Sequence, residues 1–379
     1  MNRNWENLKL KDIGTIFSGN SINAKIKEEK YFTIDSGIPY IATKDISYSL
    51  EINYDNGINI PDTDIEKFKI APSGSVIICA EGGSAGRKLG ILNQDVCFVN
   101  KLFALTPNEK VIGKYIFYWY QSNNFQKDFQ DKMTGLIGGV SKLKFQNIKI
   151  PIPSIVEQKQ IVEILDKAFE SIEQAKINIE KNIENTKELF QSRLNNYNFK
   201  KEKLVNIVNI KTGKLNSNEA VEDGKYPFFT CSREVYRIDK YSYDCEAILL
   251  AGNNAVGDFN VKHYKGKFDA YQRTYIITSK DESKLNYRFL YFQMIGSLAD
   301  LKKKSVGTGT KFLRLPMIQS FEIYYPDILE QEKYVYEIDS LNEQTKQLEK
   351  HYKQKLKNLE ELKKSILQKA FSGELLNDS

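Results

Sequence analysis

The residue types that perform catalysis are few in this sequence of 379 residues. Only two histidines occur, His263 and His351, so neither nucleophile activation by histidine nor a histidine-rich zinc or iron site is expected. The segment 82–89, GGSAGRKL, lacks the GxxxxGK[ST] spacing of a phosphate-binding loop. The Asp/Asn-Pro-Pro-aromatic tetrapeptide of amino-methyltransferases is absent, and the acidic residues form no nuclease-like cluster. We therefore predict a non-enzymatic chain that holds no metal or cofactor of its own.

Cationic and amide side chains lie instead in turns that follow apolar runs. Arg87 and Lys88 come after VIICAEGGSAG, and Asn253 and Asn254 come after AILLAG. Lysine and arginine bind phosphates, and arginine, lysine and asparagine also reach base edges, while glycine lets the backbone approach a ligand closely. These turns and related positions are predicted to bind DNA, although for each single residue a solvated surface charge is the alternative. The predicted DNA-binding set is Lys44, Arg87, Lys88, Lys101, Lys142, Lys144, Arg233, Asn253, Asn254, Arg273, Lys311 and Arg314.

Positive charge is confined to two parts of the chain. The net charge is +3 over residues 1–154 and +6 over residues 198–327, but −2 over 155–197 and −1 over 328–379. A polyanion such as DNA would be attracted to the first and third of these segments.

The chain repeats itself once, with matching segments in the same order in both halves, which indicates a duplication. KLKDIGTIFSG (9–19) aligns without gaps on KLVNIVNIKTG (203–213), and PSIVEQKQIVEILD (153–166) aligns on PDILEQEKYVYEID (326–339). Between them, the paired segments are 37–45 with 224–234, 75–91 with 246–261, 100–106 with 272–278, and 115–121 with 287–293.

Each half contains short runs of β-branched and aromatic residues broken by glycine, asparagine and aspartate, which predicts strands. Apolar residues at helical spacing after residues 115 and 287 predict one helix in each half. We expect an α+β fold in which two similar strand-rich domains are separated by two long antiparallel helices that form a coiled coil with pseudo-two-fold symmetry. The expected segments are domain 1 (1–153), the first helix (154–197), domain 2 (198–326) and the second helix with its tail (327–373).

Apolar residues at steps of three and four predict the seam of that coiled coil. Ser154 with Glu157, and Asp327 with Glu330, resemble capping boxes. The second helix is expected to be longer by four residues, a stutter that locally unwinds a coiled coil. Separate packing of each helix on its own domain is the alternative. The predicted seam residues are Ile161, Leu165, Ala168, Ile172, Ala175, Ile179, Leu341, Leu348, Tyr352, Leu359, Leu362 and Ile366.

No apolar stretch is long enough for a transmembrane helix, and the polar N-terminus lacks the apolar segment of a signal peptide. The four cysteines contain no CxxC pair and are expected to be reduced thiols. A cytoplasmic location is therefore expected.

Three motifs resemble the specificity subunit of type I restriction–modification systems. They are W5-x-x-L-x-L-x-D-I-G14, the two P-x-I-x-E-Q helix openings, and LQKAFSGEL at 367–375. The resemblance covers essentially the whole chain and is most specific at the C-terminal motif. The second domain departs from the opening motif, with Val205 and Asn206 in place of its Trp and Asp.

The resemblance implies that each domain reads one half of a bipartite double-stranded DNA site. It also implies that the helices fix the unread spacer and dock two adenine methyltransferase subunits, to which two ATP-dependent restriction subunits are added. S-adenosylmethionine, ATP and magnesium would then belong to those partners.

Two other classes of function compete with this reading. One is a duplicated non-catalytic scaffold or ligand-binding protein that dimerises through a coiled coil, and the other is a fused methyltransferase or nuclease. An orphan or phase-variable specificity subunit is a further possibility that the sequence does not separate from an active one.

Overall fold

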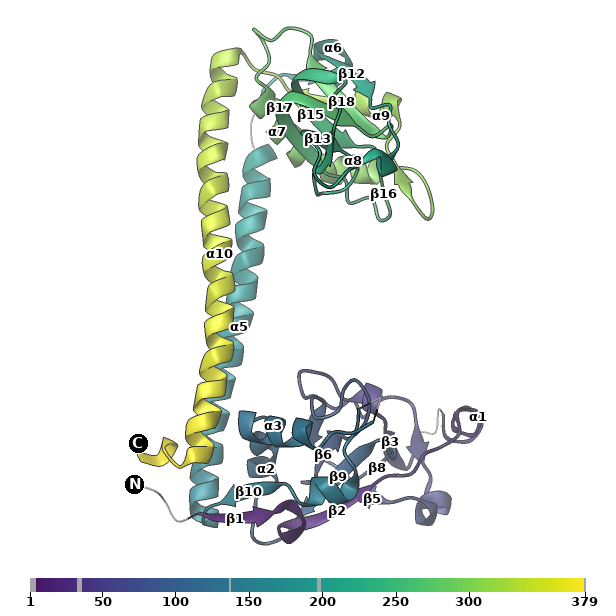
Figure 1. Ribbon diagram of the computed structural model, residues 1–379, viewed down its shortest axis with the longest axis vertical. Helices are drawn as coiled ribbons and strands as arrows, with labels where there is room; N and C mark the ends of the chain where they lie inside the picture. The colour runs from purple at the N-terminus through teal and green to yellow at the C-terminus, as the bar shows by residue number, and fades with distance from the viewer. Residues whose placement is uncertain (1–4, 33–35, 136–137, 196–198, 378–379) are drawn as a thin grey trace. The chain divides into compact units, whose positions relative to one another are not determined.

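The computed structural model describes residues 5–32, 36–135, 138–195 and 199–377. The chain forms two compact units, unit 1 with Met1–Asn178 and Lys355–Ser379, and unit 2 with Ile179–Gln354 (Figure 1). Each unit contains one strand-rich domain and parts of two long helices. The predicted four-segment division stays a prediction, and its boundary at residues 197 and 198 lies outside the described residues.

Domain 1 in unit 1 is built on two four-stranded sheets and a two-stranded ribbon. One sheet is antiparallel with the order β2-β9-β6-β7, and the other has the order β4-β3-β8-β5 with β3 and β8 parallel. The strands are β1 (Glu6–Lys9), β2 (Gly14–Ser18), β3 (Ile38–Ile41), β4 (Asn59–Ile60), β5 (Ile70–Ala71), β6 (Val76–Cys79), β7 (Leu89–Ile91), β8 (Val96–Phe98), β9 (Leu102–Pro107) and β10 (Lys149–Ile152), of which β1 pairs with β10. The helices are α1 (Ala24–Ile26), α2 (Gly113–Trp119), α3 (Asn123–Asp131) and α4 (Lys142–Gln146), with the short turns η1 (Leu10–Asp12), η2 (Lys27–Tyr31), η3 (Thr43–Asp45) and η4 (Asp62–Lys67).

Domain 2 in unit 2 has one larger sheet of six strands in the order β12-β18-β15-β17-β13-β14. Two ribbons accompany it, β11 with β20 and β16 with β19. The strands are β11 (Lys201–Lys203), β12 (Val208–Thr212), β13 (Tyr226–Phe229), β14 (Tyr236–Ile238), β15 (Tyr243–Ala251), β16 (Asn253–Asn254), β17 (Val261–Ala270), β18 (Thr274–Ser279), β19 (Lys311–Phe312) and β20 (Glu322–Tyr324). The helices are α6 (Leu204–Ile207), α7 (Tyr287–Gly296), α8 (Leu298–Lys304) and α9 (Leu315–Gln319), with the turn η5 (Ser217–Glu219).

The two domains share one strand plan, which confirms the predicted repeat and the α+β class. The antiparallel run β2-β9-β6 of domain 1 corresponds to β12-β18-β15 of domain 2, and the parallel pair β3–β8 corresponds to β13–β17. The correspondence extends to single hydrogen bonds. Ala80 N donates to Lys101 O at 2.9 Å, and Gly252 N donates to Arg273 O at 2.9 Å at the same place in the plan.

Two long helices are unbroken, α5 (Ile155–Asn195, 41 residues) and α10 (Ile328–Ser372, 45 residues), which the turn η6 (Leu375–Asn377) follows. The four-residue difference agrees with the sequence alignment. The Ser154 hydroxyl accepts a bond from Glu157 N, and Ser154 N donates to the Glu157 carboxylate, so the first capping box is formed. At the start of α10, Glu330 N donates to Asp327 Oδ1 at 3.0 Å.

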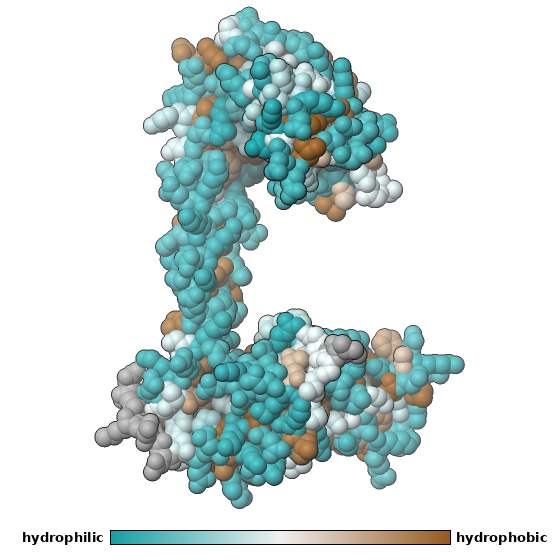
Figure 2. Space-filling view, in the orientation of Figure 1, coloured by the Kyte–Doolittle hydropathy of each residue, from teal (hydrophilic) through white to brown (hydrophobic). Residues whose placement is uncertain are grey.

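Within each unit the two helices run antiparallel. In unit 1 Lys176 pairs with Glu360, and Lys363 Nζ lies 4.7 Å from the centre of the Phe169 ring. In unit 2 the Tyr334 hydroxyl near the start of α10 donates to Leu194 O near the end of α5 at 3.2 Å. Each domain therefore packs against the start of one long helix and the end of the other. Figure 2 shows that the visible face of these helices is mostly hydrophilic.

The predicted seam residues differ in burial, and two of them require correction. On α5, Ile161, Leu165 and Ile172 are buried and Ala168, Ala175 and Ile179 are half-buried, as are Leu341, Tyr352, Leu359 and Ile366 on α10. Leu348 and Leu362, however, are 38% and 47% exposed. Their neighbours Glu349 and Lys363 are half-buried instead. Leu348 and Leu362 were predicted as seam residues because leucine is apolar. In the helix, however, the residue that follows each of them faces inward. The long side chains of Glu349 and Lys363 can occupy these positions because their aliphatic stems cover apolar surface.

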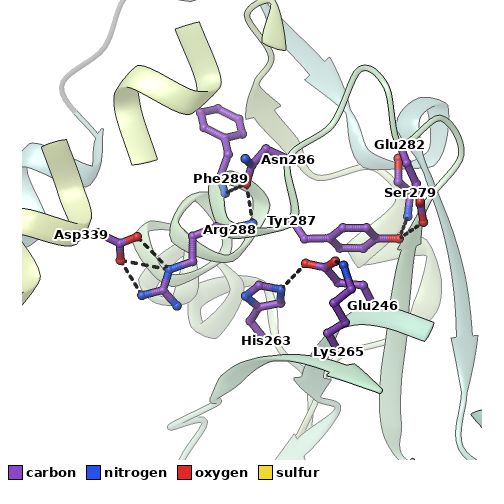
Figure 3. A network of polar contacts seen from close by, with 10 residues as sticks. All are labelled: Glu246, His263, Lys265, Ser279, Glu282, Asn286, Tyr287, Arg288, Phe289 and Asp339. Carbon is purple, nitrogen blue, oxygen red and sulfur yellow. Dashed lines mark hydrogen bonds and ion pairs between the residues drawn. The ribbon is translucent and has the colours of Figure 1, made fainter. Parts of the chain in front are cut away.

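Corresponding contacts join each domain to the long helix that follows it, and Figure 3 shows the one in unit 2. In unit 2 the Arg288 guanidinium of α7 binds both carboxylate oxygens of Asp339 on α10, with Nη2 to Oδ1 at 2.5 Å and Nε to Oδ2 at 3.3 Å. In unit 1 Lys114 Nζ lies 2.7 Å from Asp166 Oδ2, and the Tyr118 hydroxyl donates to the same carboxylate. Both joints thus use the aspartate at the same position of the repeated EQ-containing segment.

The joint also contains a buried glutamine in each unit. Gln158 accepts from Ile112 N at 2.9 Å and donates to Lys110 O and Pro153 O. Gln331 makes the same three bonds in unit 2, accepting from Asn286 N and donating to Lys284 O and Pro326 O. Both side chains are fully buried. Buried amides with all bonds satisfied fix the helix relative to its own domain.

Among the described residues, no helix combines the length and apolar character needed to cross a bilayer.

Candidate nucleic-acid interface

In domain 1, three predicted cationic residues lie in neighbouring loops. Lys44 belongs to η3, which follows β3, and Arg87 and Lys88 end the loop that connects β6 to β7. Lys88 Nζ donates to Thr43 O at 3.1 Å, which ties the two loops together. The Arg87 guanidinium donates to Gly83 O within its own loop. The structure therefore brings Lys44, Arg87 and Lys88 to one place, with no carboxylate ion-pair partner for any of them among the described residues.

A tyrosine that the sequence reading missed lies within this group. Tyr48 is 61% exposed, and its ring centre is 5.5 Å from the Arg87 guanidinium carbon and 5.1 Å from Lys88 Nζ. Its hydroxyl is 3.1 Å from the Ser84 hydroxyl. The sequence prediction considered only cationic and amide side chains as DNA contacts, and the partner serine is distant along the chain. The available signal was an aromatic residue between two serines in a polar segment, SYS.

The other three predicted residues of domain 1 form a second group. Lys101 borders a hollow together with Glu81, Thr134 and Ser141. Ser141 caps α4, where its hydroxyl accepts from Lys144 N at 3.4 Å, and exposed Lys142 and Lys144 follow on the helix. The predicted site of domain 1 thus consists of two cationic groups.

In domain 2, five predicted residues gather around the ribbon of β16 and β19. Asn253 pairs with Phe312 and Asn254 pairs with Lys311 across the ribbon. The Arg273 guanidinium lies 5.1 Å from the centre of the Phe312 ring. Arg273 and Arg314 border the same hollow beside Gly252 and Tyr275, and both arginines are exposed. Arg314 has no ion-pair partner among the described residues.

The two asparagines of this group differ in what their side chains can offer a ligand. Asn254 Oδ1 accepts bonds from Val256 N and Asp258 N, both at 2.9 Å, so its carbonyl holds the following turn together. Asn253 Oδ1 is buried and has no hydrogen-bond partner among the described residues. The two positions that looked alike in the sequence therefore have different local roles.

Arg233 lies in a different environment from the other predicted residues of domain 2. It pairs with Asp258 at 2.6 Å and borders a separate hollow with Tyr291 and Lys302. A neighbouring lysine absent from the predicted set, Lys262, donates to Ser232 O at 2.5 Å and to Asn260 Oδ1 at 2.6 Å. Burial lowers the pKa of Lys262. Lys262 is thus engaged within the protein, whereas Arg233, Arg273 and Arg314 are all exposed, and Arg233 differs from the other two in its pairing with Asp258.

The sheet of domain 2 contains the one histidine that lies outside the long helices, and its side chain is half-buried. His263 Nε2 is 2.8 Å from Glu246 Oε1, and Lys265 Nζ is 3.0 Å from Glu246 Oε2 (Figure 3). Burial raises the pKa of Glu246, but the bonds from Lys265 and His263 outweigh it and leave that pKa below its ordinary value. These groups link β15 to β17, so the histidine belongs to the sheet and not to a nucleophile pair.

Known proteins resemble this chain in both of its repeated halves. A family model described as the type I restriction modification DNA specificity domain matches residues 2–185 and again residues 196–358. The chain is 33% identical to the EcoDI specificity subunit of Escherichia coli over 45% of its own length and 37% of that protein. It is 24% identical to the MjaVIII specificity subunit of Methanocaldococcus jannaschii over 98% of this chain and 93% of that one. Thus the chain aligns with little more than a third of the E. coli subunit and with nearly all of the archaeal one.

Solved structures share the fold at low sequence identity. A chain from a type I R-M system, studied for complex assembly and conformational transition, superposes with a TM-score of 0.78 at 16% identity and 98% coverage of both chains. The HsdS subunit from Thermoanaerobacter tengcongensis gives a TM-score of 0.59 at 17% identity, with 98% of this chain and 97% of that chain covered. Since the family model accounts for both repeats and most of the sequence, this chain belongs to the family of type I restriction modification DNA specificity domain proteins.

Proposed function

We propose that this chain is the DNA sequence-recognition subunit of a type I restriction–modification complex, in which each domain reads one half of a bipartite site. The observation that carries the proposal is the repeated placement of exposed cations at matching ends of matching strands. Lys101 and Arg273 accept the same backbone bond in the two domains, and each is exposed beside a hollow. Cations bind phosphates and position the protein on the duplex, while neighbouring amide and guanidinium groups read base edges.

The long helices supply the remaining parts of the proposal. Because α5 and α10 are unbroken and anchored to their domains by buried glutamines, they are suited to fix an unread spacer between the half-sites. Their outer faces would dock two adenine methyltransferase subunits, with two ATP-dependent restriction subunits completing the complex in the cytoplasm.

The reaction chemistry is assigned to those partners. Within the described ranges, no group of three histidine, cysteine, aspartate or glutamate side chains is placed to hold a metal ion. The glycine-rich loop between β6 and β7 leads into a strand and not into a helix N-terminus, the usual site for a nucleotide phosphate. As the resemblance to specificity subunits implies, S-adenosylmethionine, ATP and magnesium would be bound by the partners, and this chain would contribute recognition.

Methylation mapping tests the proposal. The chain is co-expressed with its methyltransferase partner, and genomic DNA is sequenced for methylated adenine, with cells that lack only this chain as the control. A gapped methylated motif that depends on this chain is the expected result. Methylation without a motif, or a motif that persists when the chain is absent, would contradict it.

A scaffold or ligand-binding role predicts a different outcome in a simpler assay. The purified chain should be retained on heparin with a steep dependence on salt if its cationic loops bind polyanions. Weak retention that does not depend on salt would favour the scaffold.

A further inference from the structure

The loop at residues 46–52 of domain 1 is built to hold one aromatic side chain outward. Ile46 and Ile52 bridge its two ends, and Ile46 is fully buried. Ser47 N donates to Glu51 O at 2.9 Å, and the Ser47 hydroxyl accepts from Glu51 N at 3.0 Å. A short loop closed by these bonds has little freedom, so the side chain at its tip keeps a defined position.

The loop contains an unusual backbone conformation. Leu50 has φ of 69°, and no other non-glycine residue among those described has a positive φ. Residues with a Cβ rarely adopt this region, and such positions are found preferentially where function requires a particular geometry. The Leu50 side chain packs against the core of domain 1, while Tyr48, two residues earlier, is exposed to solvent.

Tyr48 is the most exposed aromatic side chain described in domain 1, yet it is held by partners from another loop. The Ser84 hydroxyl contacts its hydroxyl, and Arg87 and Lys88 lie over its ring. Lys88 is in turn fixed by Thr43 O. An exposed tyrosine is ordinary when it stands alone, but one fixed by a serine and two cations is positioned in advance for a ligand.

The surroundings identify the ligand as duplex DNA. Arg87 and Lys88 over the ring, with Lys44 next to Thr43 in the adjoining loop, provide positive charge for phosphates, and none of the three has a carboxylate ion-pair partner among the described residues. A tyrosine ring can contact the apolar edge of a base, such as a thymine methyl group, while its hydroxyl can bond to a polar edge. An acidic protein surface would use the cations equally well, but would leave the pre-positioned apolar ring without a purpose.

From this arrangement we infer that Tyr48 is a specificity-determining residue, which contacts a base in the half-site read by domain 1. The inference rests on the proposed recognition function and assigns one of its reading residues.

The test uses the full complex and the mapped target site. Three duplexes are compared by equilibrium binding: the intact site, and two sites in which one or the other half is replaced. Arg314→Ala, in domain 2, identifies which half belongs to which domain. Tyr48→Ala should weaken binding to the intact site by about tenfold, the size of one good base contact. It should have no effect once the half-site of domain 1 is replaced.

Two further variants separate contact from folding. Ser84→Ala leaves the ring in place but removes its hydroxyl partner, and a smaller loss confined to the same half-site is expected. Tyr241→Ala is the matched control, because Tyr241 is 43% exposed, has Lys267 over its ring and belongs to none of the candidate groups. This control should leave binding to all three duplexes unchanged.

Three results would overturn the inference. Tyr48→Ala could bind the intact site as tightly as the native protein, or it could lose equal affinity for both half-replaced duplexes. It could also keep full DNA affinity while losing co-purification with the methyltransferase subunit, which would make the loop a protein contact. If the native complex has no gapped target at all, the recognition function itself fails and this inference fails with it.

Discussion

The two domains share a backbone plan but present different side chains at their candidate interfaces. In domain 1 Arg87 and Lys88 lie over Tyr48 and donate to backbone carbonyls, whereas in domain 2 Arg273 lies over Phe312 and Arg314 has no carboxylate partner among the described residues. Meanwhile the bonds of the buried glutamines and the backbone bonds accepted by Lys101 and Arg273 are the same in both, and each joint uses an aspartate at the same position, although its partners differ. The comparison teaches that the scaffold and the reading surface vary independently, so one fold can carry two different half-site preferences.

The largest expected effect is on the free energy of unfolding, and it tests whether the buried glutamines of the two units stabilise them equally. Replacing Gln158 by leucine would leave Ile112 N, Lys110 O and Pro153 O without their partner inside unit 1. Each unsatisfied buried group costs about 1–3 kcal/mol, so the three together should lower the free energy of unfolding by at least about 3 kcal/mol. Gln331→Leu should cost about the same in unit 2. Chemical denaturation of both variants provides the measurement.

Equal losses from the two glutamine variants would support the shared scaffold. A loss in only one unit would show that the three-bond arrangement is structural in one domain and incidental in the other. Gln160→Leu, an exposed position on α5, is the control and should change stability little.

The next prediction concerns the difference between the reading surfaces. Arg314→Ala and Arg87→Ala should each weaken DNA binding about tenfold, because exposed arginines without carboxylate partners are available for phosphates or bases. Each substitution should act on a different half-site. Arg233→Ala is expected to have a smaller effect because Asp258 already neutralises that guanidinium. Binding to half-replaced duplexes at several salt concentrations measures all three.

A common loss at both half-sites would mean that these arginines attract DNA without reading it. Equal losses for Arg233 and Arg314 would contradict the view that pairing with Asp258 reduces the contribution of the exposed Arg233 to DNA binding.

Most of the fold was predictable because its signals are local or repeated. The PSIVEQ and PDILEQ segments predict both long helices through their capping residues and apolar spacing, and the duplicated strand segments predict the two domains. The seam was less predictable, since Leu348 and Leu362 have the expected residue type but sit one residue away from the half-buried positions. Burial there depends on helix rotation, to which a short apolar pattern is insensitive.

The candidate site was predictable in composition but not in arrangement. Arg233 and Asp258 are 25 residues apart, and Tyr48 and Ser84 are 36 apart, so their contacts exist only after folding. Asn253 and Asn254 are adjacent, yet only the Asn254 carbonyl is used by the following turn. Long-range contacts decide which polar side chains remain free for a ligand, and residue order alone does not specify them.

A smaller effect is expected at the joints between domains and helices. Asp339→Asn removes the charge that Arg288 binds, and Asp166→Asn does the same for Lys114. The partners are 34–45% exposed in side-chain area, so solvent screening limits each pair to about 0.5–1 kcal/mol. The Arg288 joint should cost more because its guanidinium is bidentate. Unfolding is measured at low and high salt, and the difference in the free energy of unfolding between each variant and the native protein should become smaller as the salt concentration rises.

The last prediction concerns two carboxylates that occupy different places in the two domains. Their removal should have the smallest effect on the free energy of unfolding at neutral pH, but an informative effect in acid. In domain 1 the bonds from Lys30, Lys67 and the Tyr31 hydroxyl hold the pKa of Asp64 well below its usual range. In domain 2 the pKa of Glu246 is also lowered, but here burial raises the pKa while the bonds from Lys265 and His263 lower it, and the bonds prevail. A carboxylate whose pKa is depressed on folding stabilises the protein above its unfolded pKa, about 4, and loses that contribution as the pH falls toward the folded value.

Asp64→Asn should therefore flatten the acid dependence of unfolding for unit 1 while leaving that of unit 2 unchanged, and Glu246→Gln should do the reverse. Tryptophan fluorescence follows unit 1 selectively, since Trp5 and Trp119 both lie in domain 1, while circular dichroism follows both units. If Asp64→Asn left the acid transition of the tryptophan signal where it is in the native protein, the buried carboxylate would not be what makes domain 1 acid-sensitive.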